Sequence, residues 1–398
     1  MQVTSISTEA DWEALREEWN ALVERSDSST IFLTWEWLRP WWRNFSPLFV
    51  DRALHVLVAR EEGRVVGIAP LYRSRVSARG LGSLHRIGFI GDNSGDSEYL
   101  DFIIERGQEA RVLPAFFDRL QQDRWDLLEL RLLPKRSPNF PLLERLASDR
   151  GYLVSSTAHP CSSVPLPETW ELYLKSIKRK FASHMRALLR KLPVEEDGQV
   201  TACTDPSALE QDLTGLFNLH EKRWRAAGYP GTFSSAERRR FYREMAGAFL
   251  KCGWLRFYCL RLAGKPVSYL FCFQYQQRVF ALQHAFDIEY GNRSFGSVVF
   301  AHAIKEAIES GASDVDFLRG ESWYKQRWGA VTKYAVHLTL ARPGLRTRWY
   351  VWMPPFLGWV RDRARSITPD ALLGLKRRIQ ERLRRTHLGE QAGLDGEG

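Results

Sequence analysis

The sequence predicts an α/β fold of the α+β kind, built from two copies of one unit and a basic C-terminal tail. One observation is a repeated order of elements, in which a β-hairpin precedes a strand, a helix and a further strand. Another is that the two hairpins align, as LHVLVAREEGRVVGIAPLY at 54–72 and LRFYCLRLAGKPVSYLFCF at 255–273. The third is length, because 398 residues suffice for two domains and a tail. We therefore predict domains at 1–163 and 164–341, each a mixed, mostly antiparallel sheet flanked by helices, and a tail at 342–398.

The elements of the first unit follow from hydrophobic periodicity and turn residues. Apolar residues from Trp12 to Leu22 recur every three or four positions, which predicts an amphipathic helix over 8–25. The aromatic segment 34–42 suits a helix packed against a sheet, or the wall of a groove for a sugar or an acyl chain. The other predicted elements are a hairpin at 54–72, a glycine-rich stretch at 79–95, a strand at 99–104, a helix at 109–122, a strand at 125–133, and a helix and a strand within 138–157.

The second unit opens with the most basic helical stretch, at 168–192. Its basic residues, Arg179 among them, have no acidic neighbour after Glu171. Two interpretations stay open, a solvated helix face and a clamp for an anionic substrate or carrier. The elements that follow are helices at 209–226 and 235–251, a hairpin at 254–274, a strand at 279–287, a helix at 298–309 and a strand at 314–320.

Charge and cysteine usage restrict the class of protein. The net charge of +10 favours an anionic partner, such as a CoA-like carrier, anionic lipid, an acidic glycan or nucleic acid. The five cysteines are odd in number and form no C-x-x-C pair, so we expect no metal site, no disulfide framework and a reducing compartment. The N-terminus lacks the basic and apolar regions of a secretory signal, and the apolar run 349–360 is too short to span a bilayer. These features predict a cytoplasmic protein.

The tail carries most of the net charge. Residues 342–385 hold 12 Lys and Arg against three acidic residues, interleaved with Trp349, Trp352 and Trp359. Basic residues beside interfacial aromatics are typical of a protein that associates peripherally with an anionic membrane. A tail helix that docks on its own protein is the alternative. No helix-turn-helix or zinc-finger pattern is visible, so we expect no DNA partner.

A loop before the helix at 298–309 has the pattern of an anion site. Small residues at 291–297 join a strand to the start of that helix. Helix N-termini present free backbone N–H groups, which bind phosphate. We therefore predict that a phosphate-bearing carrier binds at the N–H groups of Phe295, Gly296 and Ser297, with Arg293 and Ser294 beside them.

Three motifs stand out in the second half: GKPVSYLFCF, DFLRGESWYKQRWG and, upstream, YLKSIKRKFASHMRALLRKL. With these motifs, residues 255–329 resemble the GNAT acyltransferase superfamily. More closely, the chain resembles the CelD-like acetyltransferases associated with cellulose biosynthesis, which are related to the Fem-type aminoacyltransferases. In the GNAT phosphate-loop pattern, Q/R-x-x-G-x-G/A, this chain keeps Arg293 and Gly296 but has no second glycine. The resemblance covers about 1–340 and implies tandem GNAT-like domains, of which the C-terminal copy holds the site and the N-terminal copy is degenerate.

The resemblance also implies direct acyl transfer from acetyl-CoA, or another acyl-CoA, to an amine. Such transfer needs a base for the amine and an acid for the leaving thiolate. We expect Asp287 or Glu321 as the base and Tyr324 as the acid, since a phenol can donate to sulfur. Lys325 and Arg327 are candidates to bind pyrophosphate or an anionic acceptor, and Arg179 is a further substrate-binding candidate. His284 lies in mid-strand and is expected in the core.

These inferences lead to one favoured function and two alternatives. The favoured function is a GNAT-type acetyltransferase that modifies an amine- or sugar-bearing precursor of a polysaccharide or of the cell envelope. One alternative is a Fem-like transferase that takes aminoacyl-tRNA, with the helix at 168–192 as its RNA contact. The other is a non-catalytic accessory protein at the membrane surface, anchored through 342–385.

Overall fold

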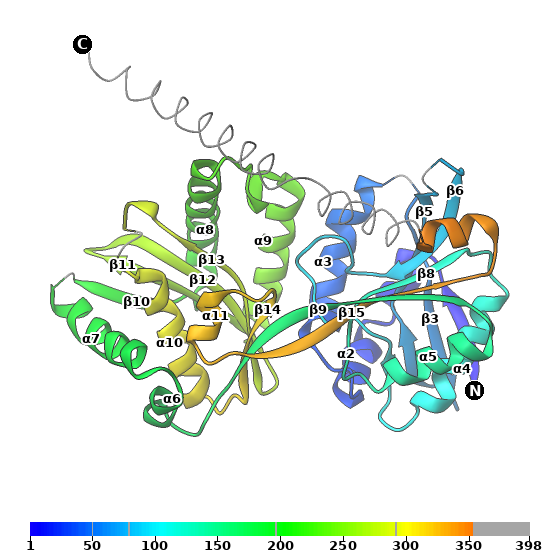
Figure 1. The fold of residues 1–398 in the computed structure, drawn as a ribbon, viewed down its shortest axis with the longest axis horizontal. Helices are drawn as coiled ribbons and strands as arrows, with labels where there is room; N and C mark the ends of the chain where they lie inside the picture. The colour runs from blue at the N-terminus through cyan, green and yellow to red at the C-terminus, as the bar shows by residue number, and fades with distance from the viewer. Residues whose placement is uncertain (50, 79, 196, 291–292, 353–398) are drawn as a thin grey trace, which may run out of the picture.

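The computed structural model describes residues 1–49, 51–78, 80–195, 197–290 and 293–352 (Figure 1). We predicted a basic helical tail over 342–398, and the part of it after residue 352 is outside the described residues. The N-terminal unit contains β1 (Gln2–Ile6), α1 (Glu9–Glu13), α2 (Arg16–Arg25), η1 (Ile31–Leu33), α3 (Trp35–Phe45), η2 (Ser46–Leu48), β2 (Ala53–Leu54), β3 (Val56–Glu61), β4 (Arg64–Ala69), β5 (Leu71–Ser77), β6 (Ser83–Phe89), β7 (Ile103–Ile104), α4 (Glu109–Gln121), β8 (Leu127–Pro134), α5 (Asn139–Asp149) and β9 (Leu153–Pro165).

The C-terminal unit follows after a short connection, and a short helix over 345–352 comes after its last strand. This unit contains α6 (Trp170–Ser176), α7 (Arg179–Glu195), β10 (Gly198–Ala202), α8 (Pro206–Ala226), η3 (Thr232–Ser234), α9 (Ala236–Lys251), β11 (Leu255–Leu262), β12 (Lys265–Tyr275), β13 (Arg278–Phe286), η4 (Ile288–Tyr290), α10 (Phe295–Glu309), β14 (Asp314–Arg319), α11 (Trp323–Arg327) and β15 (Val331–Ala341).

The predicted fold class is confirmed, as mixed sheets flanked by helices. Within the described residues, eleven strands form one sheet in the order β10-β11-β12-β13-β14-β9-β15-β8-β6-β5-β2, and β1-β3-β4-β7 form a smaller one. The repeat is visible in two parallel pairs, β6 with β8 and β13 with β14, each joined through a helix, α4 or α10. The two units therefore repeat one strand-helix-strand motif within a shared sheet.

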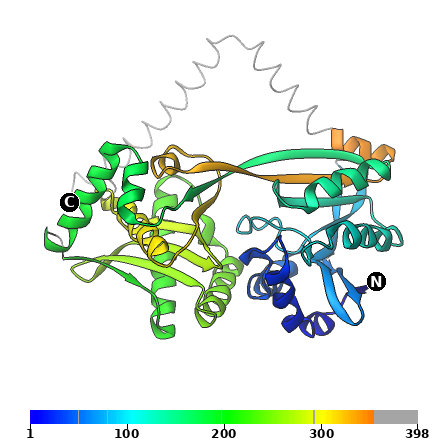
Figure 2. The ribbon, with the colours of Figure 1, turned by 90° about the horizontal axis from the view of Figure 1, so that it is seen from below.

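Each unit gives its last strand to the other. β9 ends the N-terminal unit but pairs with β14, and β15 ends the C-terminal unit but pairs with β8. The two strands also pair with each other, from Val331 opposite Ser163 to Ala341 opposite Leu153. They form the long arm that runs between the units in Figures 1 and 2. The position 163/164, which the sequence suggests as a boundary, lies inside β9.

Strands β11 and β12 are buried on both faces. Phe257, Phe271 and Phe273 pack in the core that α8 and α9 cover, whereas Tyr258 and Leu270 pack in the core under α7 and α10. The alternation follows from the two-residue period of a strand, and burial on both faces explains the nearly continuous apolar sequence. The sheet therefore presents its edges and strand ends, rather than its faces, to a ligand.

Three predicted elements differ in the structure. The helix expected over 8–25 is divided into α1 and α2, and the basic stretch at 168–192 is divided into α6 and α7 because Ile177 is extended. The strand expected over 99–104 shrinks to β7, since Tyr99 adopts a left-handed backbone (φ 53°) that a strand cannot contain. Local patterns locate these segments correctly but miss their interruptions.

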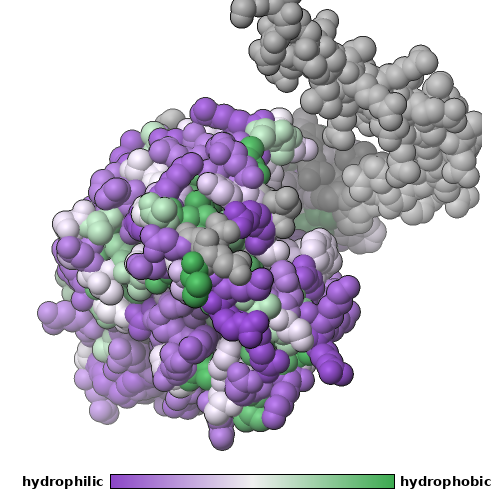
Figure 3. All heavy atoms as spheres, turned by 90° about the vertical axis from the view of Figure 1, so that its left-hand side faces the viewer, coloured by the Kyte–Doolittle hydropathy of each residue, from purple (hydrophilic) through white to green (hydrophobic). Residues whose placement is uncertain are grey.

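One face of the molecule, shown in Figure 3, is mostly polar. Figure 3 shows the side of the molecule that lies at the left in Figure 1, which is largely hydrophilic with small, separate hydrophobic patches. None of the helices in the described ranges combines the length and the apolar character that a bilayer crossing needs.

Candidate active site

The parallel strands β13 and β14 separate soon after they begin. They pair only over 278–280 and 314–316, although β13 continues to Phe286. On its other edge β13 stays paired with β12, with Leu282 as a bulge. After residue 280, β13 forms no further hydrogen-bonded pairs with β14 among the described residues. An extended ligand can hydrogen-bond to such an open strand edge as an added strand would.

A cavity of about 480 Å³ lies along this gap, and we call it the loop chamber. Aromatic side chains supply much of its wall, together with the start of α10 and two arginines. Its lining residues are Phe181, Arg223, Leu282, Gln283, His284, Phe286, Asp287, Tyr290, residues 294–297, Phe300, Trp323, Tyr324, Arg327 and Trp328.

The predicted phosphate loop forms one wall of the loop chamber. Ser294 is the N-cap of α10, in a left-handed conformation, and its side chain makes no capping hydrogen bond. The N–H groups of Phe295 and Gly296 lie at the start of the helix without an intrahelical acceptor and suit an anion. The N–H of Ser297, which we also expected to bind the carrier, instead donates to the carbonyl oxygen of Ser294 at 2.8 Å. A Cβ at Gly296 would lie 2.5 Å from Cε1 of His284, so only glycine lets the helix start approach β13 this closely.

His284 is more than the core residue that we expected, because it lines both this chamber and the next one. Burial, together with the nearby charge of Arg223, lowers the pKa of its imidazole to about 3. The ring is therefore neutral at physiological pH, with Nε2 3.3 Å from Oγ of Ser268.

Two arginines of the loop chamber are held by aromatic rings and not by carboxylates. Arg327 lies over Phe181 at 4.3 Å and over Trp323 at 5.2 Å. Arg223 lies over Phe286 at 5.4 Å, and burial lowers the pKa of its guanidinium. Neither guanidinium forms an ion pair within the described residues. Their N–H donors therefore remain available to an anionic ligand.

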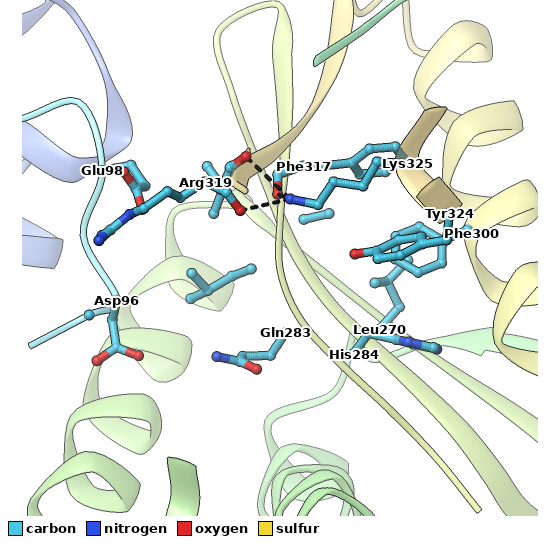
Figure 4. A pocket seen from close by; sticks show the side chains of 14 residues that line it. Asp96, Glu98, Leu270, Gln283, His284, Phe300, Phe317, Arg319, Tyr324 and Lys325 are labelled. Carbon is cyan, nitrogen blue, oxygen red and sulfur yellow. Dashed lines mark hydrogen bonds and ion pairs between the residues drawn. The ribbon is translucent and has the colours of Figure 1, made fainter. Parts of the chain in front are cut away.

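A second cavity, of about 250 Å³, adjoins the loop chamber, and we call it the acidic chamber. The two share Leu282, Gln283, His284, Phe300 and Tyr324, so they are parts of one site. Figure 4 shows the side chains of Asp96 and Glu98, from the N-terminal unit, across the acidic chamber from Tyr324. The site is therefore composed of residues from both units. The other lining residues of the acidic chamber are Gly95, Leu270, Ala281, Phe317, Leu318, Arg319 and Lys325.

Glu98 has the environment of a proton acceptor. Glu98 is 3% exposed, and its Oε1 accepts from Nε of Arg319 at 2.8 Å. The buried Oε2 has no hydrogen-bond partner in the part of the chain that the structure describes. Burial raises the pKa of the carboxyl to about 7, although Arg319 opposes the rise. Asp96 differs, because its carboxylate accepts from Arg238 at 2.9 Å and from the phenol of Tyr242 at 3.0 Å.

Tyr324 and Lys325 are neighbours in α11 but point into different surroundings. The hydroxyl of Tyr324 projects into the cavity in Figure 4, and burial raises the pKa of that phenol. Lys325 is 6% exposed, and its Nζ lies 2.8 to 2.9 Å from the carbonyl oxygens of Phe317, Arg319 and Gly320. An ammonium has three N–H groups, so these carbonyls occupy its donor capacity. The structure thus places Lys325 at the site with its charge directed to the end of β14.

The remaining candidates lie at different distances from the chambers. Asp287 lines the loop chamber, and its carboxylate accepts from Nζ of Lys222 at 2.8 Å. Burial would raise the pKa of Asp287, but the hydrogen bond from Lys222 lowers it below its ordinary value. Exposed Glu321 accepts from Oγ1 of Thr332 at 2.6 Å and lines neither chamber. Arg179 and Arg293 are also exposed and outside the two linings, although the guanidinium of Arg293 lies 5.1 Å from the ring of Phe295.

Sequence reasoning missed three residues of the site: Asp96, Glu98 and Arg223. The stretch GDNSGDSEYLDF has several acidic residues among turn formers, which is a weak signal for a functional loop. Nothing local indicates that Glu98 meets Arg319, because 221 positions separate them. Arg223 belongs to a helix whose charged residues look like an ordinary solvated face.

Comparisons with known proteins agree with this geometry. Residues 179–326 match the model of the acetyltransferase (GNAT) domain. No curated protein matches the chain by sequence. Among solved structures, FemX has a TM-score of 0.57 at 13% identity, covering 85% of this chain and 97% of its own. A conserved protein of unknown function from Bacteroides thetaiotaomicron has a TM-score of 0.55 at 13% identity, covering 86% of this chain and 100% of its own. L-PGS from Bacillus licheniformis has a TM-score of 0.50 at 11% identity, covering 84% of this chain and 95% of its own.

At such low identity these structures show a shared fold only. The domain match indicates the chemical class, which is acyl transfer. The matched segment begins at α7 and ends in α11. It includes the gap between β13 and β14 and the lining of the loop chamber apart from Arg327 and Trp328. Residues 179–326 thus match a GNAT acetyltransferase domain, set within a two-unit fold that this chain shares with FemX.

Proposed function

We propose that this protein is a GNAT-type N-acyltransferase that moves an acyl group from acyl-CoA, with acetyl-CoA as the expected donor, to an amine acceptor. The observation that carries the proposal is the gap between β13 and β14, which is continuous with the loop chamber and the acidic chamber. The loop at 294–297 and two arginines without ion pairs suit the phosphates of the carrier. The edge of β13 suits its extended arm.

The proposed chemistry is direct transfer between two bound substrates. The acyl carbonyl lies beside the bulged part of β13, where backbone N–H groups polarise it. Tyr324 remains protonated at neutral pH and donates a proton to the thiolate as the C–S bond breaks. Asp287 is held by Lys222, so we assign it a positioning role at the end of β13. In the N-terminal unit, the paired stretch of β6 and β8 holds a buried ion pair of Arg86 with Glu129, and we infer that this copy is degenerate.

We further propose that the acceptor is an amine on a polysaccharide or cell-envelope precursor, modified in the cytoplasm at the inner face of the membrane. The support for the acceptor is the resemblance of the motifs to CelD-like acetyltransferases. The support for the location is the helix at 345–352, on which Leu345 and Trp352 are 88% and 69% exposed beside Arg346 and Arg348. Exposed apolar and basic side chains on one short helix suit an anionic membrane surface.

A Fem-like reaction with aminoacyl-tRNA as the donor is the second candidate. It is favoured by the fold shared with FemX and by the exposed basic residues Lys175, Lys178 and Lys180 near the start of α7. Such a contact with RNA weakens steeply with salt. A non-catalytic accessory role at the membrane is the remaining alternative if neither acyl-CoA nor aminoacyl-tRNA binds.

Calorimetric titration with acetyl-CoA, a longer acyl-CoA and desulfo-CoA tests the proposal. We expect saturable binding that Arg223→Gln and Arg327→Gln each weaken by about 10- to 100-fold, because each removes a charge-assisted hydrogen bond. Arg225→Gln is the matched control, since Arg225 lies on the same helix but pairs with Glu221. Gly296→Trp also abolishes binding, but its Cβ displaces His284, so the arginine variants are the cleaner test.

A lack of binding in this titration distinguishes the alternatives. If the wild-type protein binds no CoA compound, the acyl-CoA proposal is wrong. Salt-sensitive binding of aminoacyl-tRNA then supports the Fem-like reaction. Binding to anionic vesicles alone supports the accessory role.

A further inference from the structure

The acidic chamber is the part of the site that the carrier does not need. The phosphate loop and the two arginines belong to the loop chamber, whereas Asp96 and Glu98 line the acidic chamber only. Both carboxylates come from a loop of the N-terminal unit, between β6 and β7. A carrier that follows β13 brings its acyl end to the shared residues, which leaves the acidic chamber for the second substrate.

Glu98 is built into this chamber and is not a surface ion pair. The groups that face it are Arg319 and Asp316 on β14, Lys325 on α11 and Cys161 on β9. Arg319 satisfies Oε1, and Lys325 directs its ammonium to backbone carbonyls. Oε2 is buried and has no donor among the described residues, and Glu98 lines a chamber that a substrate group can enter. A buried carboxylate oxygen without a partner is costly, and a ligand with an N–H group removes that cost.

We propose that the acidic chamber binds the primary amine of the acceptor and that Glu98, a residue of the N-terminal unit, takes the proton of that amine. This inference rests on the proposed acyl transfer. It assigns the N-terminal unit a part in catalysis, and it defines the acceptor as a primary ammonium on an arm narrow enough for a cavity of about 250 Å³.

The step balances in protons and electrons. The ammonium gives one proton to Glu98, and the free amine attacks the thioester carbonyl to form the C–N bond. The C–S bond then breaks, and its electron pair stays on sulfur. Tyr324 passes its proton to that thiolate and takes one from the new amide nitrogen. The products are the amide and the thiol, and protonated Glu98 releases its proton to solvent.

The test compares the full-length wild type with Glu98→Gln and a matched control, Glu105→Gln. Glutamine can still accept the hydrogen bond from Arg319 but cannot take a proton. Glu105 is also an ion-paired glutamate of the N-terminal unit, bound to Arg64, and lines neither chamber. Acetyl transfer from acetyl-CoA to ethanolamine, as the probe amine, is followed by chromatography from pH 5 to 9.

We expect the wild-type rate to rise with pH and to level off above about 7. Glu98→Gln lowers kcat by about 100-fold or more and removes this rise, while its Kd for acetyl-CoA stays within about twofold. Glu105→Gln behaves as the wild type. A Glu98→Gln enzyme that keeps the pH profile, or keeps most of kcat, overturns the role of Glu98 without affecting the proposed function.

A second measurement needs no donor. In protein labelled with [5-13C]glutamate, the Glu98 signal is the one missing from Glu98→Gln. A shift of this signal on adding ethanolamine, but not ethylene glycol, supports the amine site even if acetyl-CoA does not bind and the proposed function fails. The absence of a shift at saturating ethanolamine overturns the amine site.

Discussion

Two carboxylates of the site have the same chemistry but opposite environments. Asp287 accepts from Lys222, and its pKa is lowered below the ordinary value. Glu98 is buried with one unpartnered oxygen, and burial raises its pKa to about 7 despite Arg319. Residue type therefore does not identify the base in this site. The surroundings decide which carboxylate can take a proton at neutral pH.

The raised pKa of Glu98 predicts a dependence of stability on pH. Between pH 4.5, the ordinary pKa, and about 7, the folded protein holds a proton on Glu98 that the unfolded chain has lost. The free energy of unfolding contributed by this group is thus largest below pH 4.5 and falls as pH rises through about 7. The fall is on the order of 3 kcal/mol. We expect Glu98→Gln to lack this fall in urea unfolding from pH 4.5 to 8, and Glu105→Gln to keep it. Identical pH profiles for wild type and Glu98→Gln would disprove the prediction.

At the scale of elements, the end of β14 is held by a helix of only five residues. Helix α11 places Nζ of Lys325 within 2.9 Å of the carbonyl oxygens of Phe317, Arg319 and Gly320, where β14 leaves its parallel partner. The ammonium donates to these acceptors on the side where β14 no longer pairs with β13. The same helix places Tyr324 in the cavity. Lys325 therefore keeps the gap open and indirectly positions the phenol.

We expect Lys325→Met to lower the free energy of unfolding by about 2–4 kcal/mol, since buried carbonyls lose their donor. Lys305→Met is the control, because Lys305 is exposed on α10 and pairs only with Glu309. Its expected effect is within about 0.5 kcal/mol. Urea unfolding of both variants measures the difference. Equal stabilities of the wild type and Lys325→Met would show that other donors replace Lys325 at these carbonyl oxygens. Lys325 would then be available to bind a ligand.

At the scale of the whole molecule, the exchange of β9 and β15 joins the units. These strands are neighbours in the middle of the eleven-stranded sheet, and each also pairs with a strand of the other unit. Further links are the phenol of Tyr99, which donates to Asp316, and the ion pair of Glu98 with Arg319. The composite site therefore depends on one shared sheet and not on two docked domains.

We expect residues 1–398 to unfold in a single calorimetric transition, because neither unit can keep its sheet after the other unfolds. Saturating acetyl-CoA should raise the midpoint of this one transition, since it binds only the folded state. Two resolved transitions, of which acetyl-CoA shifts one alone, would be evidence that the units are stable separately. Scanning calorimetry with and without the ligand makes the distinction.

Much of the fold was predictable from local sequence. Alternating and continuous apolar runs predicted the hairpin of β11 and β12. A helix over 298–309 was also predicted, although α10 begins three residues earlier, at Phe295. The interruptions were not predictable, since Tyr99 leaves the strand region to reach Asp316, far along the chain. Of the residues that line the two chambers, the sequence suggested residues 294–297 and Tyr324 as candidates, whereas it did not suggest Glu98 or Arg223.

The sequence by itself determined the order of the elements, the repeat of the unit and the place of the turn that opens α10. Each of these depends on the period of apolar residues and on turn chemistry within about 20 positions, which act before any long-range contact forms. Only the tertiary structure decided which strands pair in the middle of the sheet, that Lys325 faces carbonyls, and that Glu98 faces the C-terminal unit. These features depend on contacts between distant segments, and the burial that gives Glu98 its proton affinity arises only when the two units share one sheet.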